Sequence, residues 1–240
     1  MDALLECAGL TWDVGGARII DAVDLTVAPG EFVALVGPNG AGKTSLLNLI
    51  TGLVRPARGQ IRLNGVDITG EPPHRRARRG IARTFQSATL FPTMTVAEHV
   101  ELAARVGRTR ATVTEVLDQV RLGQRASAPA GALSHGDKRK LEIALLLAGP
   151  RGTEGRGLLL LDEPMAGVAA EEVDTLVAVI REAHRDSGAA VLMVEHHMEV
   201  LMSLADRVAV LHNGALLAIG TPDHVMAQAD VQDAYLGAAR

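Results

Sequence analysis

The sequence predicts an α/β fold with a parallel-sheet core, an antiparallel β subdomain and a helical subdomain. Short apolar strand signals alternate with longer helix signals over most of the 240 residues, and strands separated by helices usually pair in parallel. Hydrophobic residues make up 48% of the chain, which is enough for a sizeable core. We expect a single domain over 1–240, with a β and α/β core at about 1–95 and 150–240 and a helical subdomain at about 96–149.

The expected elements follow from residue type and spacing. Buried parallel strands are predicted where short apolar or β-branched runs occur, namely at 31–37, 158–161, 189–194 and 207–211. An Asn-Gly pair at 213–214 predicts a hairpin turn after the last of these. Helices are expected at 42–53, 96–105, 111–120, 137–148 and 171–187. Shorter strands between Gly-rich turns, at 4–10, 19–27 and 60–63, predict the antiparallel portion, and 126–130 and 151–157 are expected to be loops.

Charge and composition exclude several classes of protein. Lys and Arg number 24 against 28 Asp and Glu, so the net charge of −4 argues against binding to nucleic acid through bulk charge. A single cysteine, Cys7, excludes an internal disulfide framework and a Cys-rich zinc site, and we expect it to be buried in a strand. The longest apolar runs, 143–149 and 157–161, are far shorter than the ~20 residues that a membrane-spanning helix needs. No secretory signal is expected at the N-terminus.

The strongest functional signal is a glycine-rich loop between a predicted strand and a predicted helix. Residues 37–44 read Gly-Pro-Asn-Gly-Ala-Gly-Lys-Thr and match the phosphate-binding pattern G-x-x-x-x-G-K-[ST]. Glycines let backbone N–H groups surround a phosphate, and the helix N-terminus adds a favourable dipole. Lys43 is expected to reach the β- and γ-phosphates of a nucleotide, and Thr44 to bind Mg²⁺.

A second signal is the apolar run that ends in Asp162 and Glu163. Ligands of parallel sheets lie at the carboxyl ends of strands, so both carboxylates are expected beside the same phosphates. Asp162 would contact Mg²⁺ directly or through water, and Glu163 would activate a water molecule as general base. Without the phosphate-binding loop, such a run would indicate only the end of an ordinary strand.

A third signal is the segment Leu-Ser-His-Gly-Asp at 133–137. Ser134 is expected to cap a helix, with Asp137 at the third helical position as in a variant capping box. The segment is either only a helix cap or a second phosphate site, because a capped helix start is suited to an anion. In the second case another copy of the chain would present it to the nucleotide.

These motifs, in this order, make the chain resemble the nucleotide-binding subunits of ABC transporters. The resemblance covers nearly the whole chain and rests on the loop at 37–44, the Leu-Ser-x-Gly signature at 133–136, the Leu-Leu-Leu-Leu-Asp-Glu-Pro strand at 158–164 and a later strand that ends before a histidine. It is nearest to the importers of branched-chain amino acids and urea. The segments typical of that group are 80–86, 90–96, 141–144, 163–167 and 234–237.

The resemblance implies further roles. Gln86 matches the glutamine that touches Mg²⁺ and the attacking water, and His196 matches the histidine that contacts the γ-phosphate. Ser134 and Gly136 match the signature residues that complete the ATP site of the opposite subunit. The expected catalytic residues are Glu163, His196 and Gln86; the expected Mg²⁺ ligands are Thr44, Gln86 and Asp162. The expected nucleotide contacts are Asn39, Gly40, Ala41, Gly42, Lys43, Thr44, Ser45, Trp12, Val14, Ser134 and Gly136.

The chain departs from the family pattern in several places. Val14 stands where the family usually places the aromatic residue that stacks on adenine. Trp12 lies two residues earlier, on the same face if the segment is extended, and is either the substitute or a partly buried structural residue. His135 replaces a common glycine of the signature, the loop at 165–169 lacks a common aspartate, and His197 stands beside His196 in place of another aspartate.

The resemblance implies an ATP-hydrolysing subunit, with ATP and Mg²⁺ as cofactors, that powers uptake of an amino acid or urea. Its expected partners are transmembrane permease subunits, a second ATPase subunit of the same or a different kind and, indirectly, an extracytoplasmic solute-binding protein, at the cytoplasmic face of the membrane. The alternatives are the ATPase of another transport system, an ABC ATPase outside transport, or a nucleotide-binding scaffold without turnover. The basic cluster at 74–79 is expected to be a solvated helix or a surface for a partner or lipid headgroups.

Overall fold

The structure is a computed structural model that describes residues 3–84, 90–107, 109, 111–150 and 157–236. Contacts along the chain divide it into two compact units. Unit 1 comprises Met1–Arg76 together with Ala190–Arg240, and unit 2 comprises Ala77–Ala189. The helices of the expected helical subdomain fall within unit 2, which also contains two strands of the α/β part.

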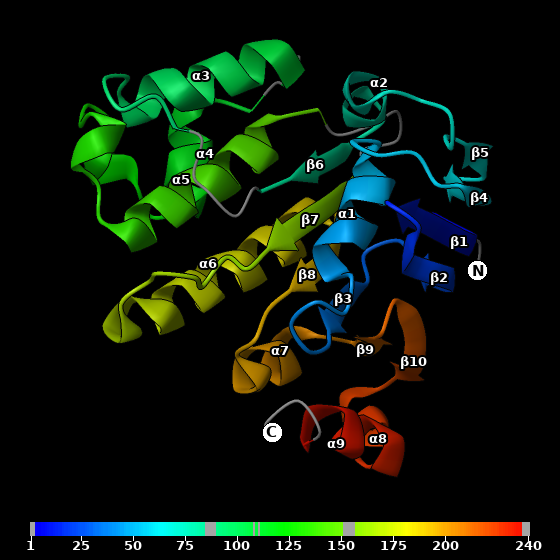
Figure 1. Ribbon diagram of the computed structural model, residues 1–240. Coiled ribbons are helices and arrows are strands. Elements are labelled where there is room, and N and C mark those ends of the chain that lie inside the picture. The colour runs from blue at the N-terminus through cyan, green and yellow to red at the C-terminus, as the bar shows by residue number, and fades with distance from the viewer. Residues whose placement is uncertain (1–2, 85–89, 108, 110, 151–156, 237–240) are drawn as a thin grey trace. The chain divides into compact units, whose positions relative to one another are not determined.

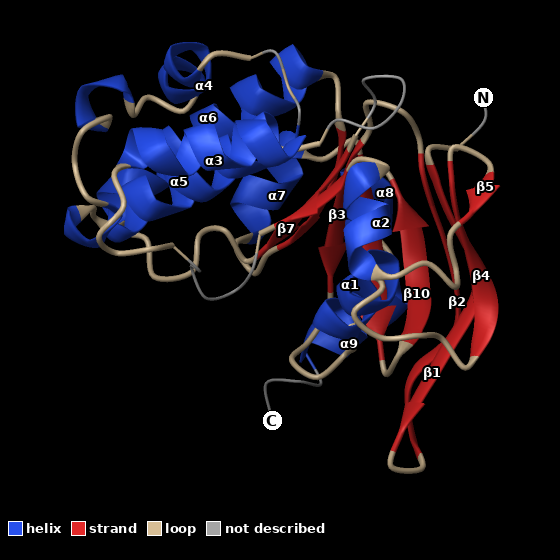
Figure 2. Cartoon of the chain, turned by 90° about the horizontal axis from the view of Figure 1, so that it is seen from above, coloured by secondary structure: helices blue, strands red, loops and turns tan. Residues whose placement is uncertain are grey.

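Unit 1 contains the antiparallel sheet that the Gly-rich turns predict (Figure 2). Its strands lie in the order β2-β1-β4-β5, and each pair is antiparallel. They are β1 (Leu5–Val14), β2 (Ala17–Val27), β4 (Arg58–Leu63) and β5 (Val66–Asp67). Cys7 is buried in β1 as expected, and burial raises the pKa of its thiol to about 12, so the thiol stays protonated and unreactive.

Unit 1 also contains strands of the parallel core, in the order β10-β9-β3-β8. The central strand β3 (Phe32–Val36) is buried along its whole length and pairs in parallel with β8 (Ala190–Val194) and β9 (Arg207–His212). β10 (Ala215–Gly220) returns antiparallel to β9 through the expected Asn213-Gly214 turn. The helices of unit 1 are α1 (Lys43–Thr51), which follows β3 (Figure 1), and α7 (Met198–Leu204), α8 (Pro222–Met226) and α9 (Ala229–Leu236).

Unit 2 joins a parallel strand pair to a group of helices. β6 (Ile81–Arg83) pairs in parallel with β7 (Leu158–Asp162), a strand that is buried throughout. The helices are α3 (Val96–Gly107), α4 (Val113–Gln119), α5 (His135–Ala148) and α6 (Ala170–Ser187), with short 3₁₀ turns at Gly123–Arg125 and Ala130–Ala132. α5 packs against α3, α4 and α6. Thr112 and Glu115 form a reciprocal capping box at the start of α4.

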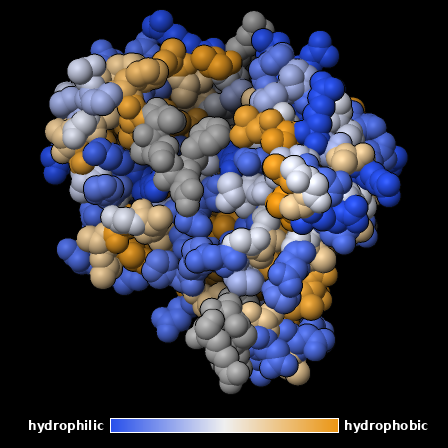
Figure 3. All heavy atoms as spheres, viewed as in Figure 1, coloured by the Kyte–Doolittle hydropathy of each residue, from blue (hydrophilic) through white to orange (hydrophobic). Residues whose placement is uncertain are grey.

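The surface agrees with a chain whose apolar residues are mostly buried. On the face shown in Figure 3, hydrophobic residues form small separate patches among hydrophilic ones. In the described parts of the chain, no helix combines the length and apolar character needed to cross a membrane. The expected loop at 151–157 lies, except for Gly157, outside the described residues.

The basic cluster corrects one sequence-based expectation, because one of its arginines is buried. Helix α2 (Pro73–Arg78) leaves most of the cluster exposed, but Arg76 is only 1% exposed. Its guanidinium donates hydrogen bonds to the carbonyl oxygens of Leu49 (2.7 Å), Ile50 (2.9 Å), Thr69 (2.9 Å) and Glu71 (3.0 Å). Leu49 and Ile50 belong to the last turn of α1, where carbonyls lack the usual partner four residues on; that of Leu49 also accepts the N–H of Gly52 (3.1 Å). Arg76 therefore closes the C-terminal end of α1.

We expect Arg76→Met to lower the free energy of unfolding by about 3 kcal/mol. Methionine keeps the apolar part of the side chain, but the carbonyls that accept from the guanidinium lose their charged donor. Urea denaturation followed by circular dichroism measures the change. Arg75→Met is the matched control: Arg75 lies one residue earlier in α2 and is exposed, so its loss should change stability by no more than about 0.5 kcal/mol. Equal effects of the two substitutions would contradict the assigned role of Arg76.

Candidate functional site

Two loops of unit 1 leave the same edge of the sheet from neighbouring strands. β3 and β8 pair in parallel, with Leu35 opposite Val194, so both strands end at the same level. The glycine-rich loop begins at Gly37 after β3, and Glu195 with His196 follows β8. The carboxyl-end edge of a parallel sheet is where ligands of such folds bind. The loop at 37–42 and His196 are therefore on the expected edge of unit 1.

The glycine-rich loop ends in the N-terminus of α1, as predicted. Gly42 caps the helix with φ of 103°, and a Cβ there would lie 2.8 Å from Cδ1 of Ile20 and 2.9 Å from the carbonyl oxygen of Ile19. Both the backbone conformation and the close approach of β2 require glycine at this position. The first turn of α1 carries no acidic residue that would neutralise its dipole. Thr44 and Asn39 are exposed and Ser45 is half-buried, so all three are accessible from outside.

Lys43 is buried and folded back on its own loop. Its Nζ donates hydrogen bonds to the carbonyl oxygens of Gly37 (2.7 Å) and Pro38 (3.1 Å). A buried ammonium needs such acceptors, because an ion without partners is costly in a protein interior. The carbonyls are neutral, so a phosphate that enters the loop offers Lys43 stronger, charge-assisted bonds.

Neighbouring segments of unit 1 support the loop through the backbone. The N–H of Gly214, in the turn between β9 and β10, donates to the carbonyl oxygen of Ala41 (3.1 Å). The N–H of Asp21, in β2, donates in turn to the carbonyl oxygen of Gly214 (2.9 Å). This chain of hydrogen bonds links the phosphate-binding loop to the hairpin that carries Trp12 and Val14.

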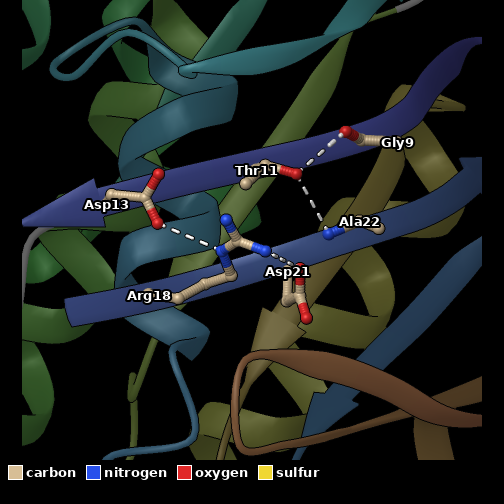
Figure 4. Close-up of polar contacts among 6 residues, drawn as sticks. All are labelled: Gly9, Thr11, Asp13, Arg18, Asp21 and Ala22. Atoms are coloured by element: carbon tan, nitrogen blue, oxygen red, sulfur yellow. Dashed lines mark hydrogen bonds and ion pairs between the residues drawn. The ribbon is translucent and has the colours of Figure 1, made fainter. Parts of the chain in front are cut away.

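That hairpin is held by an arginine between two carboxylates (Figure 4). Nε of Arg18 lies 3.1 Å from Oδ1 of Asp13, and Nη1 of Arg18 lies 3.1 Å from Oδ1 of Asp21. All three side chains are substantially exposed, so each pair contributes at most about 1 kcal/mol. The arrangement orients the hairpin end more than it stabilises the fold.

The strand pairing of the hairpin affects the expectation that Trp12 lies on the same face as Val14. The pairing of β1 with β2 shifts between Leu10 and Trp12, and again between Trp12 and Asp13. Thr11 lies at this irregularity, where its hydroxyl accepts from the N–H of Ala22 (3.2 Å) (Figure 4). Regular alternation therefore does not establish that Trp12 shares a face with Val14, which is 48% exposed. A stacking role for Trp12 remains a prediction.

A surface hollow of about 600 Å³ lies beside the phosphate-binding loop, within unit 1. Pro38 and Asn39 line it on one side, and Asp230 and Asp233 of α9 line it on another. Carboxylates repel phosphate, whereas the N-terminus of α1 and Lys43 attract it. Charge therefore favours an anion at the start of α1 over one in this hollow.

After β8, a buried carboxylate organises the two histidines. Oε2 of Glu195 accepts a hydrogen bond from the backbone N–H of His196 (2.8 Å) and lies 3.2 Å from Nδ1 of His197. Glu195 is buried, while both histidines are exposed. The carboxylate thus holds the backbone of His196 and the ring of His197.

In unit 2, the end of β7 carries Asp162, whose side chain is 2% exposed. Nη2 of Arg83 in β6 lies 2.8 Å from Oδ2 of Asp162, and the N–H of Asp162 donates to Oγ1 of Thr84 (3.0 Å). Oδ1 of Asp162 is buried and has no hydrogen-bond partner. An unsatisfied carboxylate oxygen is the donor that Mg²⁺ prefers, so this side chain fits the expected metal role.

Glu163 follows in a left-handed backbone conformation, with φ of 50°. Such a conformation is unfavourable for a residue with a side chain and costs of order 1 kcal/mol. The carbonyl oxygen of Glu163 accepts the N–H of Ala166 (3.0 Å), which fixes the turn after β7. A strained residue directly after a metal-ligand candidate is in keeping with a functional role.

The signature segment forms the start of α5, as predicted. Oγ of Ser134 accepts the N–H of Asp137 (3.1 Å), so Ser134 is the N-cap. The carboxylate of Asp137 is paired with Nζ of Lys140 (2.9 Å). Ser134 and His135 are exposed.

The carboxylate of Glu172 lies at the N-terminus of α5. The hydroxyl of Ser134 donates to Oε1 of Glu172 in α6 (2.9 Å). A Cβ on Gly136 would lie 2.8 Å from the carboxylate of Glu172, so only glycine allows this approach. Helix N-termini favour anions, and here a side chain of the same chain provides one.

The expected site residues are divided between the two units. The loop at 37–45, Trp12, Val14 and His196 belong to unit 1, while Asp162, Glu163, Ser134 and Gly136 belong to unit 2. Gln86 lies outside the described residues.

Sequence reasoning missed Arg83, Glu172 and Glu195. Arg83 and Glu172 had no signal, since a single charged residue in a short strand or a first helical turn is common. Glu195 could have been noticed as a carboxylate directly at the end of an apolar strand, like Asp162.

Known proteins resemble the chain over nearly its whole length. A family model described as ABC transporter matches residues 20–166. The chain is 38% identical to the high-affinity branched-chain amino acid transport ATP-binding protein BraF of Pseudomonas aeruginosa and 36% identical to LivG of Escherichia coli K12, with 98% of each chain covered in both cases. Among solved structures, the ADP conformation of MJ1267, an ATP-binding cassette of an ABC transporter, matches with a TM-score of 0.86 and 26% identity, covering 99% of this chain and 100% of that one.

The two histidines after β8 should respond differently to substitution. We expect His196→Ala to lose most ATP turnover, about 100-fold, because His196 matches the family histidine that contacts the γ-phosphate. His197→Ala should keep turnover near that of the unsubstituted protein, since its ring contacts Glu195. Phosphate release at saturating MgATP measures both. Loss of turnover in the His197 variant alone would reverse the assignment.

Proposed function

This chain belongs to the ABC transporter family, and we propose that it is the ATP-hydrolysing subunit of an importer for branched-chain amino acids. The observation that carries the proposal is the similarity to BraF and LivG, which extends over 98% of both chains. The assignment of the solute class rests on the names of these two relatives.

We propose that ATP binds with its phosphates at the start of α1. The backbone of the loop at 37–42 and the dipole of α1 attract the phosphates, and Lys43 exchanges the carbonyls of Gly37 and Pro38 for phosphate oxygens. Asn39, Gly40, Ala41, Gly42, Thr44 and Ser45 line the same approach. The adenine would lie toward the hairpin of Trp12 and Val14.

Asp162 and Thr44 are the proposed ligands of Mg²⁺, with Gln86 as a further contact. The unsatisfied Oδ1 of Asp162 supports this role most directly. Held by these residues, Mg²⁺ would supply positive charge against the charge that develops on the phosphate oxygens. Thr44 presents an exposed side chain in the first turn of α1.

Glu163 is the proposed general base. Its carboxylate would accept a proton from a water molecule whose oxygen attacks the γ-phosphorus, which releases phosphate and leaves ADP. His196 would hold the γ-phosphate through its ring. Both residues sit at the ends of buried strands, where the backbone is well fixed.

We further propose that two such subunits enclose ATP between them. Ser134 and Gly136 of one subunit would contact the γ-phosphate bound to the other, so hydrolysis removes the bridge that holds the pair together. The second ATPase is either identical or different. Transmembrane permease subunits at the cytoplasmic face of the membrane are the direct partners, and an extracytoplasmic solute-binding protein acts through them.

Transport activity separates this proposal from an ABC ATPase of another system. The chain should co-purify with membrane subunits encoded near it, and vesicles that contain the complex should take up labelled leucine when ATP is enclosed on the ATPase side. Uptake of another solute, with no uptake of leucine, isoleucine or valine, would reject the solute class. Phosphate release without any membrane partner would favour a role outside transport.

We expect Glu163→Gln to reduce phosphate release at least about 100-fold and to accumulate an ATP-bound dimer, because the amide cannot accept the proton of the attacking water. Phosphate release and sedimentation with ATP measure the two effects. Glu171→Gln is the matched control, since Glu171 is an exposed carboxylate in the first turn of α6 and its loss changes net charge equally. Undiminished turnover in the Glu163 variant would remove Glu163 from the base role.

We also expect Glu172→Gln to strengthen ATP-dependent dimerisation by about tenfold when it is combined with Glu163→Gln. The Glu172 carboxylate lies at the start of α5, so it would repel a γ-phosphate arriving there, and the amide would not. Dissociation constants from sedimentation measure the change. Glu171→Gln in the same background should leave the constant unaltered, and weaker dimerisation of the Glu172 variant would show that the carboxylate supports the signature segment instead.

A further inference from the structure

Hydrogen bonds from β6 and the residue that follows it hold Asp162 in place. Arg83, the last residue of β6, lies opposite Leu160 in the parallel pairing, and Thr84 continues along β7 by donating its N–H to the carbonyl oxygen of Leu160 (2.9 Å). Thr84 accepts the N–H of Asp162 on its hydroxyl, and Arg83 donates to Oδ2. The backbone and one carboxylate oxygen of Asp162 are therefore both fixed from β6.

The two oxygens of this carboxylate differ sharply. Oδ2 has an arginine donor at 2.8 Å, whereas Oδ1 is buried with no hydrogen-bond partner. A buried acceptor without a partner costs about 1–3 kcal/mol, so a fold retains one only where something else is gained. Because Arg83 engages Oδ2, Oδ1 is the oxygen of Asp162 that can bind a cation.

We propose that Arg83 is a positioning residue that presents Oδ1 of Asp162 to Mg²⁺. This inference rests on the proposed function, in which Asp162 is a metal ligand. By engaging Oδ2, Arg83 prevents the carboxylate from rotating and from binding the cation with both oxygens. Mg²⁺ takes a strict octahedral arrangement and uses such carboxylates through single oxygens, so a fixed orientation favours it.

A second buried ion pair of unit 2 provides a comparison. Arg139 and Glu142 in α5 lie 2.8 Å apart with side chains 9% and 8% exposed, close to the 5% and 2% of Arg83 and Asp162. In the described residues, no oxygen of Glu142 is left buried without a partner. The unsatisfied oxygen, and not burial of an ion pair, distinguishes Asp162.

The test measures metal binding directly, with Mn²⁺ in place of Mg²⁺ and a non-hydrolysable ATP analogue. Electron paramagnetic resonance of free Mn²⁺ gives its dissociation constant for the analogue-bound protein. We expect Arg83→Met to weaken Mn²⁺ binding about 10–100-fold, the usual loss when a residue that orients a ligand is removed. Affinity for the analogue in EDTA should stay unchanged, since the phosphate-binding loop is untouched.

Two further variants make the test specific. Arg139→Met removes a buried ion pair of the same unit and should leave Mn²⁺ binding unaltered. Arg83→Lys keeps the positive charge but lacks the planar guanidinium with its several fixed donors. Its Mn²⁺ affinity should therefore lie between those of the unsubstituted protein and Arg83→Met. If Arg83→Met does not fold, Arg83→Lys alone must bind Mn²⁺ more weakly than the unsubstituted protein.

The outcomes separate the inference from the function on which it rests. Unchanged or tighter Mn²⁺ binding in the Arg83 variants overturns the positioning role, as does an equal loss in Arg139→Met. Asp162→Asn should abolish Mn²⁺ binding, and if it does not, the metal role of Asp162 itself is wrong. Loss in Asp162→Asn with no loss in Arg83→Met refutes only the role of Arg83.

Discussion

Parallel pairing of buried strands is the constraint on which the rest of this structure depends. In unit 1, β3 is buried from end to end between β8 and β9, so its side chains pack against the core and leave no polar group within the strand. Polar side chains follow where such strands end. Unit 2 follows the same rule on a smaller scale, because β7 is apolar until Asp162. Loops at strand ends are therefore the places where charged residues gather.

Several buried charges in the described residues have defined partners. A buried charge costs several kcal/mol unless it is paired or hydrogen-bonded. Arg76 satisfies the end of α1, Glu195 holds the backbone of His196, and Lys43 rests on carbonyls of its own loop. α1 thus has one end closed by a cation and the other end open to an anion, which suits the direction of its dipole.

Much of the fold and of the candidate site follows from the sequence, because both depend on local patterns. The apolar runs predict β3, β7, β8 and β9, and the spacing of glycines with Lys43 predicts the loop before α1. The short strand β6 and the helices α7, α8 and α9 were not predicted, since too few residues carry a period in them.

What the sequence could not give is long-range contact. Arg76 lies in a run of basic residues that looks solvated, and only the packing of α2 against the end of α1 selects it for burial. Trp12 was placed by regular alternation, which the shift in pairing around it interrupts. The partners of Ser134 and Asp162, namely Glu172 and Arg83, lie 38 and 79 residues away in the chain.

The two buried cations nearest the proposed chemistry hold their partners in different ways, and the difference sets their roles. Lys43 donates to the carbonyls of Gly37 and Pro38, and in the proposed site a charged phosphate oxygen would offer it bonds about twice as strong in their place. Arg83 already binds a charged carboxylate in a place almost without solvent, so leaving Asp162 would cost it a charge-assisted bond. A cation that donates to carbonyls can exchange them for a charged ligand. A cation on a strong partner is suited to keeping a ligand group in one orientation, which is what a metal with strict geometry requires.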